Sequence, residues 1–411
     1  MEATTAAPLH TGSRTIADLL PRAAELFGEH VAVKHKDADG GWRALTFAEV
    51  GGIAQEVGLG LLDLGIAPGD RVSILCTTRP EWTYASFGIS ETGAVVVPIY
   101  PTNSPEECEW VLSDSGAVAV VCEDAGQVEK VRAVRERLPD LRHIICVEPV
   151  AGTISLDELR ERGRARDRAE LEARTAAVSP ADPYTIIYTS GTTGPPKGCV
   201  LGHGNYRAIV DMVGQRELFQ GADDLVYLYL PLAHSFALLI ELASFDRGTA
   251  IAYFGGDVKQ IVAELADVKP TYLPSVPRIF EKIYGLVGAN VDADTLAKAI
   301  EVGGQVQDLR VAGQPVPEEL QAAYDQFDQT LFVNVRAAFG GRLREAVTGA
   351  APIAKEILEF FWACGVPVME GYGMTETATA ATVSTPENHK FGTVGARCRA
   401  WSCRSPTTAR S

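Results

Sequence analysis

Tyr188-Thr-Ser-Gly-Thr-Thr-Gly-Pro-Pro-Lys-Gly198 is a segment of glycine and hydroxyl residues with a single lysine, and it decides how the fold is read. Residues 182–187, just before it, are rich in apolar, β-branched and aromatic side chains and predict a buried strand. Residues 203–212, after it, have the apolar spacing of a helix. Because a strand, a glycine loop and a helix in this order aim backbone N–H groups at a phosphate, the segment predicts an α/β fold with a phosphate loop.

The composition of the loop supports a nucleotide-phosphate site. Glycines allow the backbone to approach a ligand closely, hydroxyls donate hydrogen bonds and a lysine adds positive charge. These residues are Thr189, Ser190, Gly191, Thr192, Thr193, Gly194, Lys197 and Gly198. The Walker pattern is not matched, because Lys197 follows Pro196 and precedes a glycine. An ordinary surface loop has a similar composition, but the density of hydroxyl and glycine positions beside one lysine favours phosphate binding.

The bulk composition describes a globular α/β protein of more than one sub-domain. The chain has 411 residues, of which 46% are apolar and 22% charged, so a sizeable core is available. The net charge of −16 argues against general binding to nucleic acid or to an anionic membrane. The 8 cysteines form no Cys-x-x-Cys pair, which indicates buried thiols in a reducing cytosol rather than a zinc site or disulfides. Neither a signal peptide nor a membrane span is predicted, so we expect a cytoplasmic protein that touches membranes only through its substrate.

Strands alternate with helices over residues 70–147 and again over residues 224–280 and 344–370. This alternation predicts two blocks of doubly wound, mostly parallel sheet with helices on both faces. The charged run at 156–178 separates the first block from the glycine loop, and its interspersed acids favour a solvated helix over a nucleic-acid patch.

Three further clusters are expected at strand ends, where open parallel sheets bind ligands. Residues 231–236 contain His234, which taken alone is most simply a core histidine at a helix start. Residues 349–352 taken alone are a strand-to-helix turn. Residues 371–377 combine an aromatic, two hydroxyls and one carboxylate on a glycine-containing loop, which is unusual for a structural turn.

Together with the glycine loop, these clusters in this order resemble the adenylate-forming family of acyl-CoA synthetases, luciferases and peptide-synthetase adenylation domains. The resemblance covers residues 14–395, which would form an incomplete AMP-binding N-terminal domain. Within the family, residues 100–116 and 274–284 are most similar to bacterial long-chain fatty-acid–CoA ligases. The resemblance implies ATP-dependent formation of acyl-AMP from a fatty acid, followed by transfer of the acyl group to CoA.

The resemblance also implies a role for each motif. The glycine loop would hold the β- and γ-phosphates, Gly349 to Pro352 and Tyr372 would enclose the adenine, and Thr375 would bond the α-phosphate. His234 would lie beside the reacting carboxylate, and Glu376 with Thr189 would help to place Mg²⁺. Phe236 and Leu239 are candidates for an acyl-pocket wall, with ordinary core as an equal alternative. The implied nucleotide contacts are Thr189, Ser190, Gly191, Thr192, Thr193, Gly194, Lys197, Gly349, Ala350, Ala351, Pro352, Gly371, Tyr372, Gly373, Met374 and Thr375.

The last residues depart from the family pattern. After residues 391–395 the family continues with a β-barrel sub-domain and a C-terminal lid that carries a lysine, whereas residues 396–411 here have no apolar periodicity. A one-base shift of the reading frame near Arg397 would restore a family-like segment, so we interpret 396–411 as an aberrant, disordered tail. We expect a chain without this sub-domain and lid to be poor both at forming acyl-AMP and at transferring the acyl group to CoA.

Two alternatives remain open from the sequence. One is adenylation of a different acid, aryl or short-chain. The other is a non-catalytic ATP-binding remnant. The oligomeric state and the acyl chain length are not indicated by any motif.

Overall fold

The computed structural model describes residues 10–37, 39–190, 194–214, 219 and 221–398. The chain divides into two compact units, Met1–Pro274 (unit 1) and Ser275–Ser411 (unit 2). Unit 1 contains a mostly parallel sheet and the strands β1, β2, β10, β11 and β12 of a second one, and unit 2 contains four further paired strands. The expected α/β architecture of two doubly wound, mostly parallel sheets is confirmed.

The first sheet of unit 1 has seven strands in the order β7-β6-β5-β3-β4-β8-β9. Its strands are parallel except for the last pair, β8 and β9, which is antiparallel. The strands are β3 (Arg71–Leu75), β4 (Val95–Ile99), β5 (Ala117–Cys122), β6 (His143–Cys146), β7 (Ile154–Ser155), β8 (Pro183–Thr189) and β9 (Lys197–Gly202).

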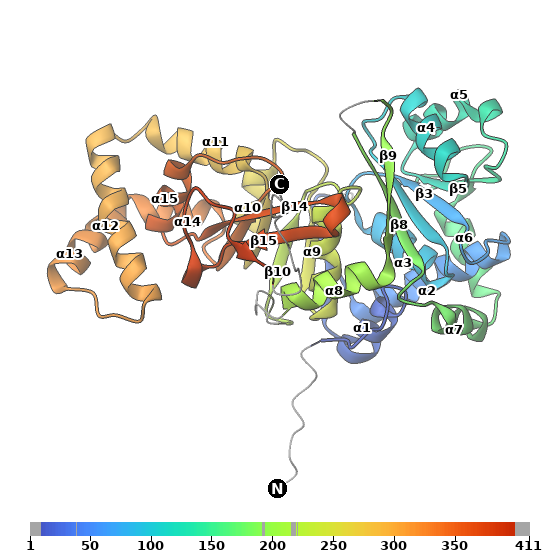
Figure 1. Cartoon of the computed structure of the whole chain (residues 1–411), viewed down its shortest axis with the longest axis horizontal. Helices are drawn as coiled ribbons and strands as arrows, with labels where there is room; N and C mark the ends of the chain where they lie inside the picture. Colours follow the sequence, from blue (N-terminus) through green and yellow to red (C-terminus); the bar gives the residue numbers. More distant parts are fainter. Residues whose placement is uncertain (1–9, 38, 191–193, 215–218, 220, 399–411) are drawn as a thin grey trace, which may run out of the picture. The chain divides into compact units, whose positions relative to one another are not determined.

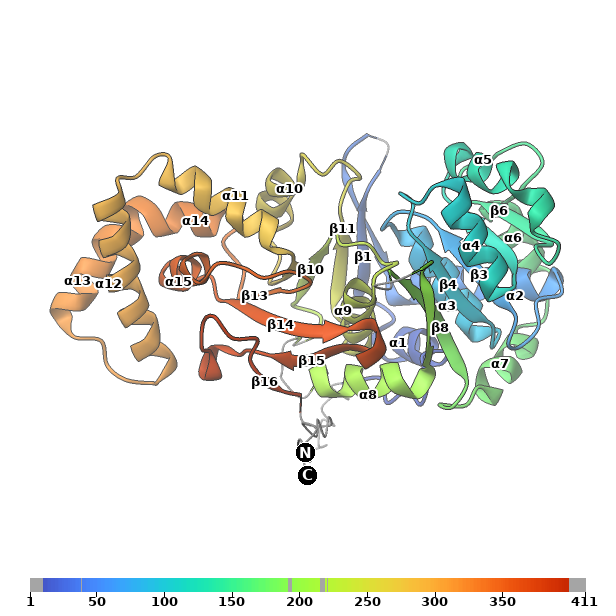
Figure 2. The same ribbon diagram turned by 45° about the horizontal axis from the view of Figure 1, so that its top comes forward.

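Helices cover both faces of this sheet. The chain passes from β3 to β4 in one direction and from β4 to β5 in the other, so right-handed crossovers place the intervening helices on opposite faces. Figures 1 and 2 show α4 and α5 together on one face and α2 and α3 on the other. These helices are α2 (Phe47–Asp63), α3 (Pro80–Glu91), α4 (Pro105–Ser115), α5 (Ala125–Ala133), α6 (Leu156–Arg164) and α7 (Arg168–Ala177). The charged run at 156–178, expected as one helix, is two: α6 and α7.

Local capping determines where two of these helices begin. Thr46 precedes α2 and accepts from the backbone N–H of Glu49, while the Glu49 carboxylate accepts from the N–H of Thr46. Ser104 and Glu107 form the same reciprocal box at the start of α4. Each box satisfies two N–H groups that have no partner within the helix.

The second group of strands in unit 1 has the order β12-β10-β11-β1-β2. Strands β10, β11, β12 and β1 are parallel, and β2 returns antiparallel to β1 as a hairpin. The elements are α1 (Leu19–Phe27), β1 (Val31–Lys36), β2 (Trp42–Thr46), α8 (His203–Gly214), β10 (Leu225–Leu228), α9 (Ser235–Asp246), β11 (Ala250–Tyr253), α10 (Ile261–Val268) and β12 (Tyr272–Ser275).

Unit 2 joins a helical segment to a small sheet. Strands β13 and β14 are parallel, and β15 and β16 extend the sheet antiparallel. Figure 2 shows the four strands in that order. The elements are α11 (Pro277–Gly288), α12 (Ala293–Val311), α13 (Glu318–Phe327), α14 (Val333–Ala338), β13 (Glu345–Thr348), α15 (Lys355–Ala363), β14 (Val368–Met374), β15 (Thr379–Val383) and β16 (Ala396–Arg397).

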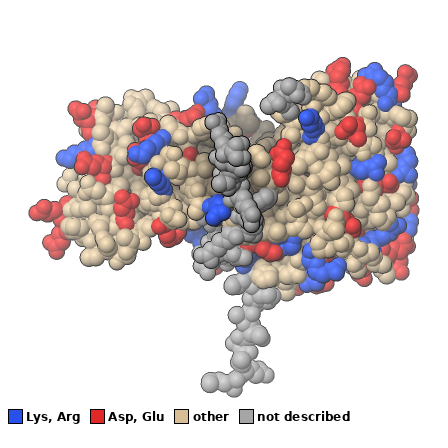
Figure 3. Space-filling model, viewed as in Figure 1, with Lys and Arg blue, Asp and Glu red and all other residues tan. Residues whose placement is uncertain are grey.

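The distribution of charged side chains, the state of the cysteines and the character of the helices can be compared with what the composition predicted. On the face drawn in Figure 3, acidic and basic side chains are intermingled within each unit rather than gathered into one basic patch. Five of the seven described cysteines are buried and all seven are free thiols. Among the described residues, no helix has both the length and the apolar character to cross a bilayer.

Candidate functional site

The glycine-rich segment forms the turn of a β-hairpin. Thr189, the last residue of β8, pairs with Lys197, the first residue of β9, and the two strands run side by side in Figures 1 and 2. The predicted order of strand, loop and helix is therefore wrong, since α8 begins only at His203, after β9. Strand β9 was not predicted from the sequence because Gly198 and Gly202 interrupt its short apolar pattern.

The described part of this turn is open to solvent. Ser190, Gly194 and Lys197 are exposed, and Gly194 has a φ of +83°, which only glycine adopts without strain. Gly191, Thr192 and Thr193, which were also expected to bind phosphate, lie outside the described residues. With no helix starting at the loop, hydroxyls, backbone N–H groups and Lys197 are left as the groups that can bind an anion.

Helix α4 bonds to the hairpin at strand β8 and at the turn residue that precedes β9. The indole Nε1–H of Trp110 donates to the carbonyl oxygen of Pro196 at 2.8 Å. The hydroxyl of Tyr188 donates to Oδ2 of Asp114 at 2.6 Å. Burial, together with the Asp114 carboxylate, raises the pKa of Tyr188, so the phenol stays protonated as the donor. Sequence reasoning did not find Trp110 or Asp114 as supports of the loop.

Gly198 leaves space for the Tyr188 ring that contacts Asp114. It lies opposite Tyr188 across the hairpin, and a Cβ atom at position 198 would come within 3.2 Å of Tyr188 Cζ and 2.8 Å of Ile186 Cγ2. Any side chain here would push the Tyr188 ring away from Asp114. The glycine therefore supports the loop by leaving space for the Tyr188 ring.

His234 lies at the start of α9, as expected, and is half-buried. Its Nδ1 accepts a hydrogen bond from the N–H of Phe236 at 3.2 Å, so the neutral ring carries its proton on Nε2. Burial lowers the pKa of His234, which favours this neutral form. The side chain is thus a neutral hydrogen-bond donor.

The proposed acyl-wall residues on α9 differ in exposure. Leu239 is only 2% exposed and packs in the core, whereas Phe236 is partly exposed. The helix is buried nearly all round, including Glu241, whose Oε1 accepts from the hydroxyls of Thr83 and Tyr253. Burial raises the pKa of Glu241 to about 7.

In unit 2, two separate motifs meet at the ends of neighbouring strands. Thr348 of β13 pairs with Glu370 of β14, so the segments that follow, starting at Gly349 and Gly371, lie side by side. A Cβ atom on Gly349 would lie 3.1 Å from the carbonyl oxygen of Gly371. The 349–352 cluster follows the end of β13, as expected, whereas Gly371 lies just past the last residue of β14 that pairs with β13. Next to them, Ala350 has a φ of +66°, a conformation that is uncommon for a residue with a side chain.

Residues 371–374 are strand rather than the expected loop. They continue β14, which pairs there with β15, and the pairing shifts register between Tyr372 and Gly373. A Cβ atom on Gly373 would lie 1.4 Å from the carbonyl oxygen of Thr379, so no other residue fits. Tyr372 remains 50% exposed and offers a free aromatic face.

A single 3₁₀ turn, Thr375–Thr377, follows β14. Thr377 supports it, since its Oγ1 accepts from the N–H of Met374 at 3.0 Å. Thr375 is buried and Glu376 is exposed, while Ala351 and Pro352 on the neighbouring turn are also exposed. In the part of the chain that is described, no three His, Cys, Asp or Glu side chains converge as a metal site.

Comparison with known proteins identifies the family. Residues 20–404 match the model of the AMP-binding enzyme family, so the chain belongs to that family. It is 38% identical over 364 residues to the long-chain-fatty-acid–CoA ligase FadD15 of Mycobacterium bovis, covering 87% of this chain and 60% of that protein. The chain thus spans about 60% of the length of this relative.

Two solved structures share the fold. The N-terminal domain of FACL13 from Mycobacterium tuberculosis superposes with a TM-score of 0.68 at 22% identity, over 93% of this chain and 82% of that one. The anthranilate CoA ligase AuaEII in complex with anthranoyl-AMP superposes with a TM-score of 0.69 at 21% identity, over 97% of this chain and 65% of that one.

Proposed function

We propose that this protein activates a long-chain fatty acid with ATP and transfers the acyl group to CoA. Membership of the AMP-binding family implies the use of ATP and CoA, and the 38% identity with a long-chain-fatty-acid–CoA ligase supports the fatty acid as substrate. The structural observation that supports this most is the adjacency of the 349–352 turn and the exposed Tyr372, which together offer polar backbone and an aromatic face to a nucleotide base.

The reaction has two steps. A carboxylate oxygen of the fatty acid attacks the α-phosphorus of ATP, and the bond to the bridging oxygen breaks to release pyrophosphate. The thiolate of CoA then attacks the acyl carbonyl carbon, and AMP leaves. Such transfers depend mainly on positioning and charge stabilisation by the protein.

In unit 1, the hairpin turn would hold the β- and γ-phosphates through Ser190, Gly194 and Lys197, together with residues 191–193. Lys197 contributes charge, and the α4 anchors keep the two strands in place. His234 would donate its Nε2–H to an oxygen of the reacting carboxylate. Because His234 is neutral, it can steady the carboxylate without fully neutralising the nucleophile.

In unit 2, Gly349 to Pro352 and Gly371 to Met374 would bind the adenosine part, with Tyr372 against the adenine ring. The hydroxyl of Thr375 would bond the α-phosphate. Glu376 and Thr189 each offer the oxygen donors that Mg²⁺ prefers, and so few protein ligands suit an ion that is bound largely through phosphates and water. When bound, Mg²⁺ would neutralise phosphate charge.

The decisive experiment is ATP–pyrophosphate exchange by the purified 411-residue chain with palmitate, acetate or benzoate, alongside calorimetric titration with ATP. We expect slow but measurable exchange with palmitate, and this rate should fall at least tenfold in Lys197→Ala through loss of a charge-assisted contact. Lys298→Ala, at an exposed position on α12, is the matched control and should retain exchange.

Other results would support the alternatives. Exchange with benzoate or acetate but not palmitate would replace the fatty-acid assignment by another acid. ATP binding without exchange for any acid would indicate a non-catalytic nucleotide-binding protein. Absence of ATP binding by a folded chain would reject the proposal.

A further inference from the structure

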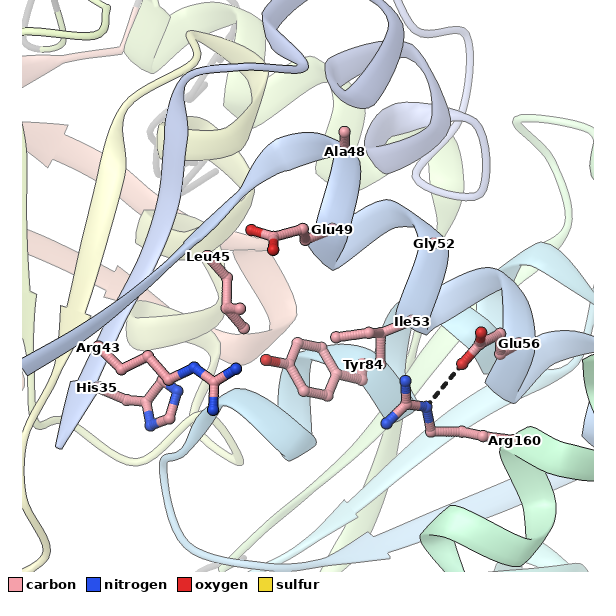
Figure 4. A pocket seen from close by; sticks show the side chains of 10 residues that line it. All are labelled: His35, Arg43, Leu45, Ala48, Glu49, Gly52, Ile53, Glu56, Tyr84 and Arg160. Carbon is pink, nitrogen blue, oxygen red and sulfur yellow. Dashed lines mark hydrogen bonds and ion pairs between the residues drawn. The ribbon is translucent and has the colours of Figure 1, made fainter. Parts of the chain in front are cut away.

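A pocket in unit 1 contains none of the residues assigned to ATP or the acyl group. It has a volume of about 450 Å³, within the range of small-molecule sites. Its walls come from the hairpin of β1 and β2, from α2 and α3, and from one residue of α6 (Figure 4).

Two side chains of the hairpin enter the pocket from the same face. His35 and Arg43 are directly opposite each other in the antiparallel pair, so both project to one side of it. Figure 4 shows the Arg43 guanidinium directed towards the hydroxyl of Tyr84. Within the described part of the chain, Arg43 has neither an ion pair nor a hydrogen bond from its side chain.

Tyr84 supplies a hydroxyl donor at the pocket that has no partner among the described residues. The residue is only 6% exposed, yet its hydroxyl faces the pocket and makes no hydrogen bond to any described residue. Burial raises the pKa of Tyr84, so the phenol is neutral and able to donate. A ligand acceptor in the pocket could therefore take this hydrogen bond without displacing a protein partner.

The acidic residues around the pocket are already engaged. Glu56 pairs with Arg160 at 2.8 Å (Figure 4). It also pairs with Arg164 at 2.9 Å. The carboxylate of Glu49 accepts from the backbone N–H of Thr46 at 2.7 Å as part of the α2 capping box. Arg43 and the Tyr84 hydroxyl therefore remain as uncommitted donors.

We propose that this pocket binds a small carboxylic acid with an apolar body. The carboxylate would take both the planar fork of Arg43 and the hydroxyl of Tyr84, while Leu45 and Ile53 contact the apolar part. Such a ligand would link the β1–β2 hairpin to α3. The site goes beyond the proposed ligase function and does not depend on it.

Benzoate is a suitable probe, tested by calorimetric titration and thermal unfolding of the full chain. We expect saturable binding in the millimolar range and a rise in Tm, as for a small ligand with one ion pair. Arg43→Gln should weaken binding at least tenfold and Tyr84→Phe about fivefold. Arg278→Gln, with 86% of its side chain exposed on α11, is the control and should bind normally.

A His234→Ala variant separates this pocket from the acyl site. Benzoate binding that survives His234→Ala and fails in Arg43→Gln assigns it to this pocket, whatever acid the enzyme activates. The proposal is overturned if benzoate does not saturate the wild-type chain, if Arg43→Gln binds it unchanged while remaining folded, or if inorganic phosphate binds more tightly than benzoate.

Discussion

The indole N–H of Trp110 donates to the carbonyl oxygen of Pro196 at 2.8 Å, although 86 residues separate the two in the chain. One turn further along α4, Asp114 accepts from the hydroxyl of Tyr188 on the opposite strand of the same hairpin. A helix started by a capping box thus holds both ends of the turn proposed to bind phosphate. The turn is therefore positioned by residues of α4, which are distant from it in the sequence.

Trp110→Phe should loosen the hairpin turn. The ring can still pack, but the donor to Pro196 is lost, so we expect a loss of about 1 kcal/mol in unfolding free energy. ATP affinity, measured by calorimetry, should fall about fivefold because the turn must be ordered on binding.

Trp42→Phe provides the matched control for this variant. The indole N–H of Trp42 also donates one long-range hydrogen bond, to Oδ2 of Asp267 at 2.6 Å. Trp42 is in β2 and is not part of the β8–β9 hairpin. A similar loss of stability with unchanged ATP affinity is expected. Equal losses of ATP affinity in both variants would contradict a positioning role for Trp110.

Glu91 should make stability fall as the pH rises. It is 3% exposed on α3, its Oε1 has no hydrogen-bond partner among the described residues, and burial raises its pKa to about 8. Between the unfolded value, near 4.5, and the folded value the native state holds the extra proton, so unfolding free energy decreases with pH. In the wild type, the unfolding free energy should decrease by on the order of 3 kcal/mol between about pH 5 and about pH 9 because of Glu91, and Glu91→Gln should abolish this decrease.

Thermal unfolding followed across that pH range tests this expectation. Glu172→Gln on α7 is the control, because Glu172 lines the same cavity as Glu91 but is exposed. It should leave the pH profile unchanged. A Glu91→Gln profile that parallels the wild type would show that Glu91 is not the group responsible.

Neighbouring glycines on α12 should respond in opposite ways to alanine. A Cβ atom on Gly303 would lie 2.6 Å from Cβ and 2.7 Å from the carbonyl oxygen of Ala363, whereas one on Gly304 would meet nothing within 4 Å. Gly303→Ala should destabilise by about 1–3 kcal/mol through overpacking against α15. Gly304→Ala should stabilise by about 0.5–1 kcal/mol through helix propensity. Chemical denaturation measures both, and equal effects would show that α12 does not pack as closely on α15 as described.

Asp246 and Asp211 bind the same arginine but should differ in importance. The Arg207 guanidinium is bonded to Asp246 at 2.8 Å, where both side chains are buried, and to Asp211, which is 54% exposed. The pKa of Asp246 is lowered by Arg207 and Thr11 in spite of burial, which by itself would raise it. Asp246→Ala removes the buried carboxylate partner of Arg207 and leaves the half-exposed Asp211 as its remaining counter-charge, so it should cost about 3 kcal/mol, whereas Asp211→Ala should cost about 0–1 kcal/mol. Urea unfolding measures the free energy of unfolding of both variants. Comparable losses in the two would show that the buried pair with Asp246 stabilises the fold no more than the exposed pair with Asp211.

Prediction from the sequence succeeded where the signal is local. The alternation of strands and helices over residues 70–147 predicted a doubly wound parallel block, and β3, β4, β5 and β6 form one. It failed at β9, where glycines weaken the strand pattern, and at residues 371–374, where glycines suggested a loop. In both places pairing with a neighbouring strand supplies hydrogen bonds that outweigh the weak local preference.

The sequence by itself therefore determined the α/β class, most element positions, the order of the motifs and their family resemblance, because periodicity, capping and turn chemistry act over a few residues. Only the tertiary structure decided that the glycine segment turns a hairpin held by α4, that residues 349 and 371 lie together, and that Tyr84 and Arg43 share a pocket. Those relationships depend on strand order and packing between distant segments, where burial and long-range hydrogen bonds outweigh local preference.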